Sequence, residues 1–290
     1  MFGECHGHIF MNGVNYKEAV ARHKNGVDKE VVQNRLAAYR DAGITFFREG
    51  GDYLGVASYA AGIAGEYGID YRSPVFAIHK KGHYGSIVGL EYETLPEFAA
   101  LVKKAAKAGA DFIKIMFSGL LDFNTYGRIT GTGLPGTEMK ELVHICHEEG
   151  FAVMVHVNRA ETIRDAILSG VDSIEHGAYM GEEELSLLAE RDTVWIPTIS
   201  PVGNLAGKGL FDETVIAKIV AMQTDNVRKA FAMGVHVGLG SDAGAVTVPH
   251  VEGLFSEYEY LLAAADGDKP RLDGILETSE AIIKEKFRRH

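Results

Sequence analysis

Short apolar runs alternate with longer amphipathic stretches along most of the chain, and many of the longer stretches end at a glycine. The short runs are rich in Val, Ile and Phe, which is typical of buried strands, whereas apolar residues in the longer stretches recur at helical spacing. The pattern predicts strands at residues 4–9, 44–48, 74–78, 112–116, 152–157, 173–175, 194–196 and 235–239. It predicts helices at residues 28–42, 53–67, 95–108, 138–149, 160–169, 182–191, 212–233, 251–264 and about 272–288.

This alternation of strands and helices predicts an α/β fold, the (β/α)8 or TIM barrel. A chain of 290 residues with 46% hydrophobic content can bury the core of one large barrel. No linker or change in composition marks a second domain, so we expect a single metal-dependent hydrolase barrel over residues 1–290. Active sites of such barrels lie at the carboxyl ends of the strands, where the long connections 117–135 and 198–211 would also lie.

Charge and cysteine content exclude several classes of partner. The formal net charge of −11 argues against a nucleic-acid partner and against an anionic membrane surface, which leaves small molecules as substrates. Cys5 and Cys146 cannot form a disulfide framework, and the start of the chain lacks the basic and apolar regions of a signal peptide. We therefore expect a cytoplasmic protein.

Histidines two residues apart stand in the first predicted strand. In an extended strand, residues i and i+2 point to the same face, so His6 and His8 present two imidazoles side by side. Such a pair is suited to chelating a metal ion, although a pair alone is a weak indication.

Other potential ligands stand at the ends of later predicted strands. Lys114 lies between Ile113 and Ile115, so strand alternation turns the lysine toward the barrel interior. The remaining candidates, which also fall at strand ends, are His156, His176 and Asp242. Since the carboxyl ends of parallel strands meet at one rim, we expect these side chains to converge with the first histidine pair.

Four motifs extend this pattern into a family resemblance. Residues 43–51 (GITFFREGG), 112–119 (FIKIMFSG), 172–177 (DSIEHG) and 240–242 (GSD) resemble the amidohydrolase superfamily. More narrowly, they are similar to its imidazolonepropionase-like and lysine-containing prolidase-like branch.

The resemblance implies a binuclear zinc centre. In that branch the strand-1 histidines and the strand-8 aspartate bind one zinc ion, which assigns His6, His8 and Asp242. The strand-5 and strand-6 histidines bind the second, which assigns His156 and His176. A carboxylated lysine, here Lys114, bridges the two ions, and Asp242 carries the catalytic proton.

The chain departs from the family pattern at three points. Glu4 replaces an aspartate that usually stands two residues before the histidine pair, and Leu120 and Leu121 follow the strand-4 Ser-Gly where another glycine is common. Relatives also carry a small β-sandwich domain, which we expect this barrel to lack. The side of the barrel that this domain shields in relatives would then be covered by the barrel's own surface residues or by a homo-oligomer contact.

Physical chemistry supports the same assignment. Neutral imidazole suits zinc, and two divalent ions ~4 Å apart repel each other unless anions lie between them. A neutral lysine amine that captures carbon dioxide becomes a carbamate with one oxygen for each metal ion. The expected cofactors are therefore two divalent ions, zinc first, with carbon dioxide or bicarbonate to carboxylate Lys114; a bridging hydroxide would act as the nucleophile.

Candidate substrate-binding residues come from the predicted loops. His83 stands in a segment that resembles a Gly-Gly-His-Gly motif of the branch, and Arg48 either holds a substrate carboxylate or pairs with an acid at the rim. His250 follows the last predicted strand, and Tyr126 lies in the long 117–135 connection.

The expected function is hydrolysis of a C–N bond in a dipeptide, an N-acyl amino acid or a cyclic amide. Lactone or ester hydrolysis uses the same site and remains an alternative. A Schiff-base aldolase would use Lys114 as the nucleophile, but it leaves the histidines unexplained. A non-catalytic metal-binding barrel is the third alternative.

Overall fold

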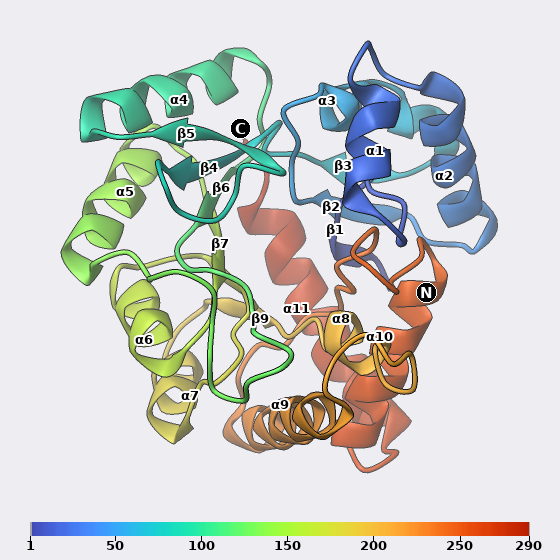
Figure 1. Ribbon diagram of the computed structural model, residues 1–290, viewed down its shortest axis with the longest axis vertical. Helices are drawn as coiled ribbons and strands as arrows, with labels where there is room; N and C mark the ends of the chain where they lie inside the picture. Colours follow the sequence, from blue (N-terminus) through green and yellow to red (C-terminus); the bar gives the residue numbers. More distant parts are fainter. Residues whose placement is uncertain (1, 290) are drawn as a thin grey trace.

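Parallel strands occupy the middle of the molecule and helices surround them (Figure 1). The computed structural model describes residues 2–289. Its strands are β1 (Glu4–Gly7), β2 (Phe46–Glu49), β3 (Asp70–Arg72), β4 (Ala77–Lys80), β5 (Gly89–Tyr92), β6 (Ile113–Met116), β7 (Val153–Val157), β8 (Ser173–His176) and β9 (Val194–Ile196).

Helices separate most of the strands along the chain. They are α1 (Tyr16–His23), α2 (Lys29–Asp41), α3 (Val56–Ile63), the 3₁₀ helix η1 (Ala64–Tyr67), α4 (Leu95–Lys107), α5 (Gly136–Glu148), α6 (Ala160–Leu168), α7 (Glu182–Ala189), α8 (Ser200–Gly203), α9 (Glu213–Met233), α10 (Glu252–Ala264) and α11 (Lys269–Lys286). Asp28 and Asp212 cap α2 and α9, because their side chains accept hydrogen bonds from first-turn N–H groups. Helix α1 was not predicted.

The strands form two parallel sheets, one in the order β1-β2-β3 and the other in the order β5-β4-β6-β7-β8-β9. Hydrogen-bonded bridges join residues 235–243 to both sheets, at Val237 with Trp195 of β9 and at Ala243 with Gly7 of β1. The result is a mixed α/β fold of the TIM-barrel-like kind.

The predicted strand at residues 235–239 is present only as this bridging segment. The side of Gly238 faces Ile196, and a Cβ atom there would lie 2.6 Å from its side chain. A Cβ atom added at Gly240 would lie 2.7 Å from the backbone nitrogen of His6. The glycines thus permit a close passage between β9 and β1 but weaken a regular strand.

The predicted strand at residues 74–78 was misplaced. Pro74 donates no hydrogen bond and Val75 has a φ angle of 67°, so extended backbone resumes only at β4. Residues before this break form β3, which pairs with β2, and residues after β4 form β5; neither had been predicted as a strand.

The last helix fills the end of the fold opposite the strand carboxyl ends. Ile283 of α11 and Phe287 pack with Phe46, Phe112 and other buried residues at the amino ends of the strands. Lys114 of β6 is buried, as its position between two isoleucines predicted. The carboxyl ends of the strands are therefore left to form the site.

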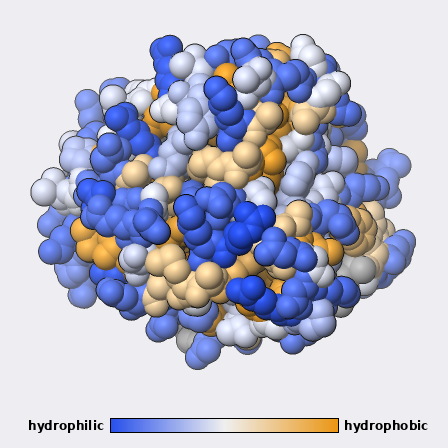
Figure 2. All heavy atoms as spheres, turned by 90° about the horizontal axis from the view of Figure 1, so that it is seen from below, coloured by the Kyte–Doolittle hydropathy of each residue, from blue (hydrophilic) through white to orange (hydrophobic). Residues whose placement is uncertain are grey.

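The outer surface mixes residue types. On the face seen in Figure 2, hydrophilic residues predominate and hydrophobic residues gather in small patches among them. Within residues 2–289, no helix combines the length and the apolar character that crossing a membrane requires.

Candidate metal centre

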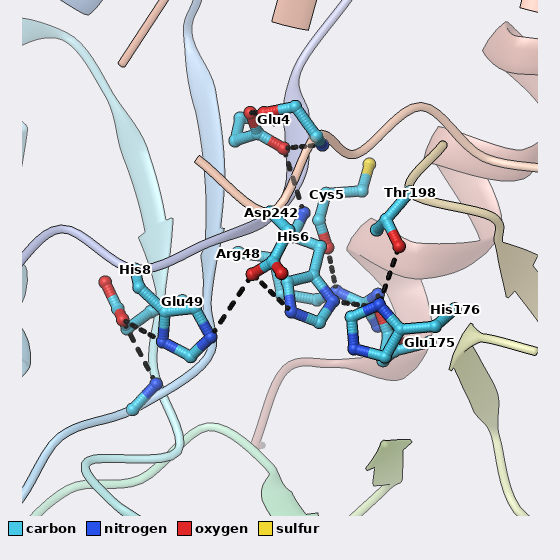
Figure 3. Close-up of polar contacts among 12 residues, drawn as sticks. Glu4, Cys5, His6, His8, Arg48, Glu49, Glu175, His176, Thr198 and Asp242 are labelled. Carbon is cyan, nitrogen blue, oxygen red and sulfur yellow. Dashed lines mark hydrogen bonds and ion pairs between the residues drawn. The ribbon is translucent and has the colours of Figure 1, made fainter. Parts of the chain in front are cut away.

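One histidine of β1, a second histidine just after it and one aspartate converge on a common point (Figure 3). Oδ1 of Asp242 lies 3.5 Å from Nε2 of His6 and 3.5 Å from Nε2 of His8. The three donor atoms lie within 4.8 Å of one another, a spacing that suits a single metal ion. Two imidazoles and a carboxylate form a donor set that zinc and similar divalent ions accept.

A second histidine pair lies next to the first. The ring centroids of His156 on β7 and His176 on β8 are 4.5 Å apart, and the ring of His176 is 5.1 Å from that of His6. The parallel register of β7 and β8 places Val157 beside His176, so both histidines reach the same rim. The structure thus brings the two predicted histidine pairs together.

Lys114 places a buried amine in the same cavity as the four histidines and Asp242. Its Nζ is buried and has no hydrogen-bond partner among the described residues. Burial lowers the pKa of Lys114 to about 8, because an ammonium in this position loses its hydration. A buried amine without a partner is costly in a folded protein, which suggests that a further group belongs beside it.

Three of the four histidines are oriented through the ring nitrogen that faces away from the centre, whereas Nδ1 of His8 has no hydrogen-bond partner among the described residues. His6 donates from Nδ1 to Oε2 of Glu175 at 2.5 Å, and Nδ1 of His176 lies 2.6 Å from Oγ1 of Thr198. His156 donates from Nε2 to the carbonyl of Gly119 at 3.1 Å. These contacts leave Nε2 of His6 and His176, and Nδ1 of His156, free to bind a metal ion.

The imidazoles are neutral at neutral pH. Burial, with the charge of Lys114 as the next cause, lowers the pKa of His8 and of His156 to about 3. Burial also lowers the pKa of His6 and of His176 well below its ordinary value. Neutral imidazole is the form that binds metal ions, so these rings need lose no proton before binding.

The buried ion pair between Arg48 and Glu175 holds the ring of His6 in place through Glu175. Arg48 donates from Nη2 to Oε1 of Glu175 at 2.9 Å and from Nη1 to Oγ of Ser173 at 2.9 Å. Its Nε donates to the carbonyl of Cys5 at 2.7 Å. Arg48 and Glu175 are both fully buried, so the guanidinium fixes the carboxylate that orients His6.

Two further buried glutamates, Glu4 of β1 and Glu49 of β2, lie near the histidine pair. Glu4, the departure from the family pattern, accepts hydrogen bonds from the backbone and hydroxyl of Ser241. Glu49 accepts from the backbone of Ile9, and its Oε1 lies 3.8 Å from Nδ1 of His8. Burial raises the pKa of Glu4 and of Glu49 to about 8. The longer side chain of Glu4 therefore holds β1 to the segment that carries Asp242.

The backbone of the site is unusual at the residues that carry the donors. His176, Thr198 and Asp242 have φ angles of 68°, 45° and 60°, in the left-handed region that non-glycine residues seldom adopt. Such strain persists where the surrounding structure enforces it, and it is frequent at functional sites.

Gly50 leaves room for the imidazole of His8. A Cβ atom at this position would lie 2.1 Å from the ring of His8, so only glycine fits there.

A cavity of about 450 Å³ opens beside the donors. The six predicted metal ligands all line it. Its other walls are mainly apolar and come from the loops after the strands, in particular residues 117–135 and 198–211. Its volume suits a small organic molecule.

None of the four predicted substrate-binding residues lines this cavity. Arg48 is committed to Glu175, which favours the ion-pair alternative over a substrate clamp. Nδ1 of His83 lies 3.2 Å from the carbonyl oxygen of Thr132. His250 forms hydrogen bonds with the hydroxyl of Tyr39 and with the carbonyl oxygen of Met11. Tyr126 is 46% exposed and packs edge-on against Tyr179.

Several residues of the site were not predicted. Glu175 could have been, because alternation along β8 places Ser173 and Glu175 on one face, directed inward. Tyr84, next to His83, does line the cavity, with its ring centroid 5.1 Å from that of His156. Thr198 carried no signal in the sequence, because its place depends on the path of a loop.

Comparison with known proteins identifies the family. The sequence profile of the amidohydrolase family matches residues 5–270. The chain belongs to the amidohydrolase family. This membership agrees with the superfamily predicted from the motifs. Amidohydrolases generally use divalent metal ions, and His6, His8 and Asp242 form a candidate site for one.

Curated relatives match only part of the amidohydrolase chain. An uncharacterized protein of Mycobacterium tuberculosis is 25% identical over 170 residues, which cover 56% of this chain and 44% of that protein. Ochratoxinase of Aspergillus niger is 26% identical over 193 residues, covering 63% of this chain and 38% of that enzyme. The chain thus spans less than half of the length of these curated relatives.

Solved structures confirm the fold. A Xaa-Pro dipeptidase with methionine in its active site aligns with a TM-score of 0.76 at 23% identity, over 97% of this chain and 74% of the other. A. niger ochratoxinase aligns with a TM-score of 0.73 at 19% identity, over 94% of this chain and 68% of the other. At these identities the likeness concerns the fold alone.

Proposed function

We propose that this amidohydrolase is a binuclear metal hydrolase that cleaves a C–N bond. The observation that carries the proposal is the convergence of four neutral imidazoles, Asp242 and the buried amine of Lys114 on one cavity. The names of structural neighbours, a Xaa-Pro dipeptidase and an ochratoxinase, are consistent with hydrolysis.

The donor set fits two divalent ions. His6, His8 and Asp242 would hold one ion, and His156 and His176 would hold the second. Lys114 would bridge them once its amine is carboxylated, which also gives its unpartnered Nζ a role. Zinc is the expected metal because neutral imidazoles dominate the set. Bound ions of this kind would bring the pKa of water toward 7 and polarise a substrate carbonyl.

The remaining chemistry falls to residues of the chain. Asp242 would accept a proton as water attacks and return it to the leaving nitrogen, which departs too slowly as an unprotonated anion. Glu175 and Thr198 would keep His6 and His176 in their ligand orientations. Tyr84 would donate a hydrogen bond to the substrate carbonyl oxygen, since it lines the cavity and burial raises its pKa, which keeps the hydroxyl protonated.

Hydrolysis of an ester or lactone is a variant of this function. The same residues serve it, and an oxygen leaving group demands less protonation from Asp242.

Reconstitution with zinc and bicarbonate, followed by a screen of amides, cyclic amides and lactones for released amine or acid, tests the proposal. We expect metal-dependent release that the His176→Ala variant loses. A fully metallated wild-type protein that releases no product from any of these classes would contradict it.

A further inference from the structure

The walls of the cavity are apolar on the side away from the histidines. Tyr16, Ile87, Leu121, Phe123, Leu205 and Phe211 all line it. They come from the first residue of α1, the loop before β5 and the long connections after β6 and β9, so four parts of the chain present apolar surface to one space. A site with such walls gains affinity from apolar substrate groups.

The two long connections meet to form one of these walls. The rings of Phe123 and Phe211 lie edge to face with centroids 5.1 Å apart. Beside them, the backbone N–H of Asp212 donates to Oδ1 of Asn124 at 3.1 Å. Leu121 and Phe123 also pack against the buried cluster that contains Val202 and Leu205. The apolar wall is therefore supported by packing from behind.

No cation is left in the cavity to receive a substrate carboxylate. Within residues 2–289, Lys114 is the only lysine or arginine that lines it, and that amine belongs to the metal centre. Arg48 lies buried beneath the first strand in its pair with Glu175. Arg128, in the 117–135 connection, is 70% exposed and lies 3.7 Å from Asp122, outside the lining.

The metal centre is the only counter-charge that the described lining of the cavity offers to a substrate. Asp242, the one acid among the described residues of the lining, is a ligand of the proposed centre and supplies no positive charge to an anionic substrate. An unpaired carboxylate in an apolar pocket loses its hydration without compensation.

From this geometry we propose that the site takes an uncharged substrate with a large apolar or aromatic group, and that it rejects substrates carrying a free carboxylate. The inference rests on the proposed function and narrows its substrate class. It favours neutral amides, cyclic amides or lactones over the dipeptides and N-acyl amino acids expected from the sequence.

The test compares two ligands that differ only by one carboxylate. They are the uncleavable ketomethylene analogues of N-(phenylacetyl)phenylalanine and of N-(phenylacetyl)phenethylamine, and their dissociation constants for the zinc-loaded protein are measured by calorimetry. We expect the uncharged analogue to bind at least about 10-fold more tightly. Equal binding, tighter binding of the carboxylate, or binding of neither analogue would overturn the inference.

A charge added to the wall provides a second readout. In Leu121→Arg a guanidinium would face the cavity. The affinity for the carboxylate analogue, relative to that for the uncharged analogue, should therefore rise by about 10-fold. Leu168→Arg, on the outer face of α6 where Leu168 is 55% exposed, should leave the ratio unchanged. An unchanged ratio in Leu121→Arg would count against the inference.

Cleavage of the two corresponding amides tests the proposed function separately. A binding preference for the uncharged analogue without release of amine from either amide would overturn C–N hydrolysis and leave the substrate preference standing. Release of phenylalanine in preference to phenethylamine would support hydrolysis and overturn the substrate preference.

Discussion

Arg48 and Glu175 form a fully buried ion pair directly beneath His6. Nη2 of Arg48 lies 2.9 Å from Oε1 of Glu175, and the other carboxylate oxygen lies 2.5 Å from Nδ1 of His6 (Figure 3). One carboxylate is thus shared between a structural cation on β2 and a predicted ligand on β1. The pair links the stability of the fold to the orientation of the donor.

Arg48→Met should destabilise the protein by roughly 3 to 5 kcal/mol, because it leaves Glu175 buried without its counter-charge. Urea unfolding of the metal-free protein measures this loss. Lys81→Met serves as the control, since its partner Glu93 is 63% exposed and such pairs contribute at most about 1 kcal/mol. A loss in Arg48→Met no larger than in the control would contradict the structural role of the pair.

Glu175→Gln should weaken metal binding about 10- to 100-fold, because the amide holds the His6 ring less firmly and lowers its basicity. Competition with a chelator of known affinity measures the change. An unaltered metal affinity in a folded Glu175→Gln protein would show that Glu175 does not influence metal binding.

Gly50→Ala should displace the ring of His8 and reduce metal binding at the His6 and His8 side, because the new methyl group has no space. Metal content per chain after dialysis measures this effect. Gly62→Ala is the matched control: nothing lies within 4 Å of its added Cβ, and alanine within a helix should stabilise α3 by about 1 kcal/mol. Full metal content in Gly50→Ala would show that the ring moves aside without cost.

Asp242→Asn should keep most of the metal but lose roughly 10²- to 10⁴-fold in kcat on an amide, since asparagine retains an oxygen ligand and cannot carry a proton. The loss should be smaller with an ester or lactone. Rate and metal content are measured on the same preparation. Near-normal amide turnover in the fully metallated variant would leave Asp242 a ligand only.

Tyr84→Phe should lower kcat/KM about 10-fold, the value of one hydrogen bond to the substrate carbonyl. His83→Ala should change it little, because His83 faces the backbone of Thr132 outside the cavity. Steady-state kinetics of the two variants compares the neighbours directly. A larger loss in His83→Ala would restore the assignment made from the sequence.

The positions of the candidate ligands followed from the sequence because strands impose strong geometric rules. Alternation fixes the inward direction of Lys114, and parallel register brings His156 and His176 to one rim. Their roles in metal binding remain predictions. The strand boundaries were misplaced where local chemistry interrupts the strand, as at Pro74 and Val75, and at the glycines near Val237.

The substrate side of the site could not be predicted in the same way. Loop residues such as Phe123 and Phe211 meet through tertiary packing that no local pattern encodes. A long side chain can also point either way: Arg48 was a candidate at the rim, but it extends beneath β1 to Glu175. The apolar cavity therefore became visible only with the fold.

Anomalous diffraction at the zinc edge, on crystals of protein reconstituted with zinc and bicarbonate, tests the central claim most directly. We predict two zinc peaks per chain, one against Nε2 of His6 and His8 and the other against Nδ1 of His156 and Nε2 of His176, with density extending beyond Nζ of Lys114 between them. A well-ordered histidine cluster without a zinc peak, or an unmodified Lys114 beside two occupied positions, would contradict the account.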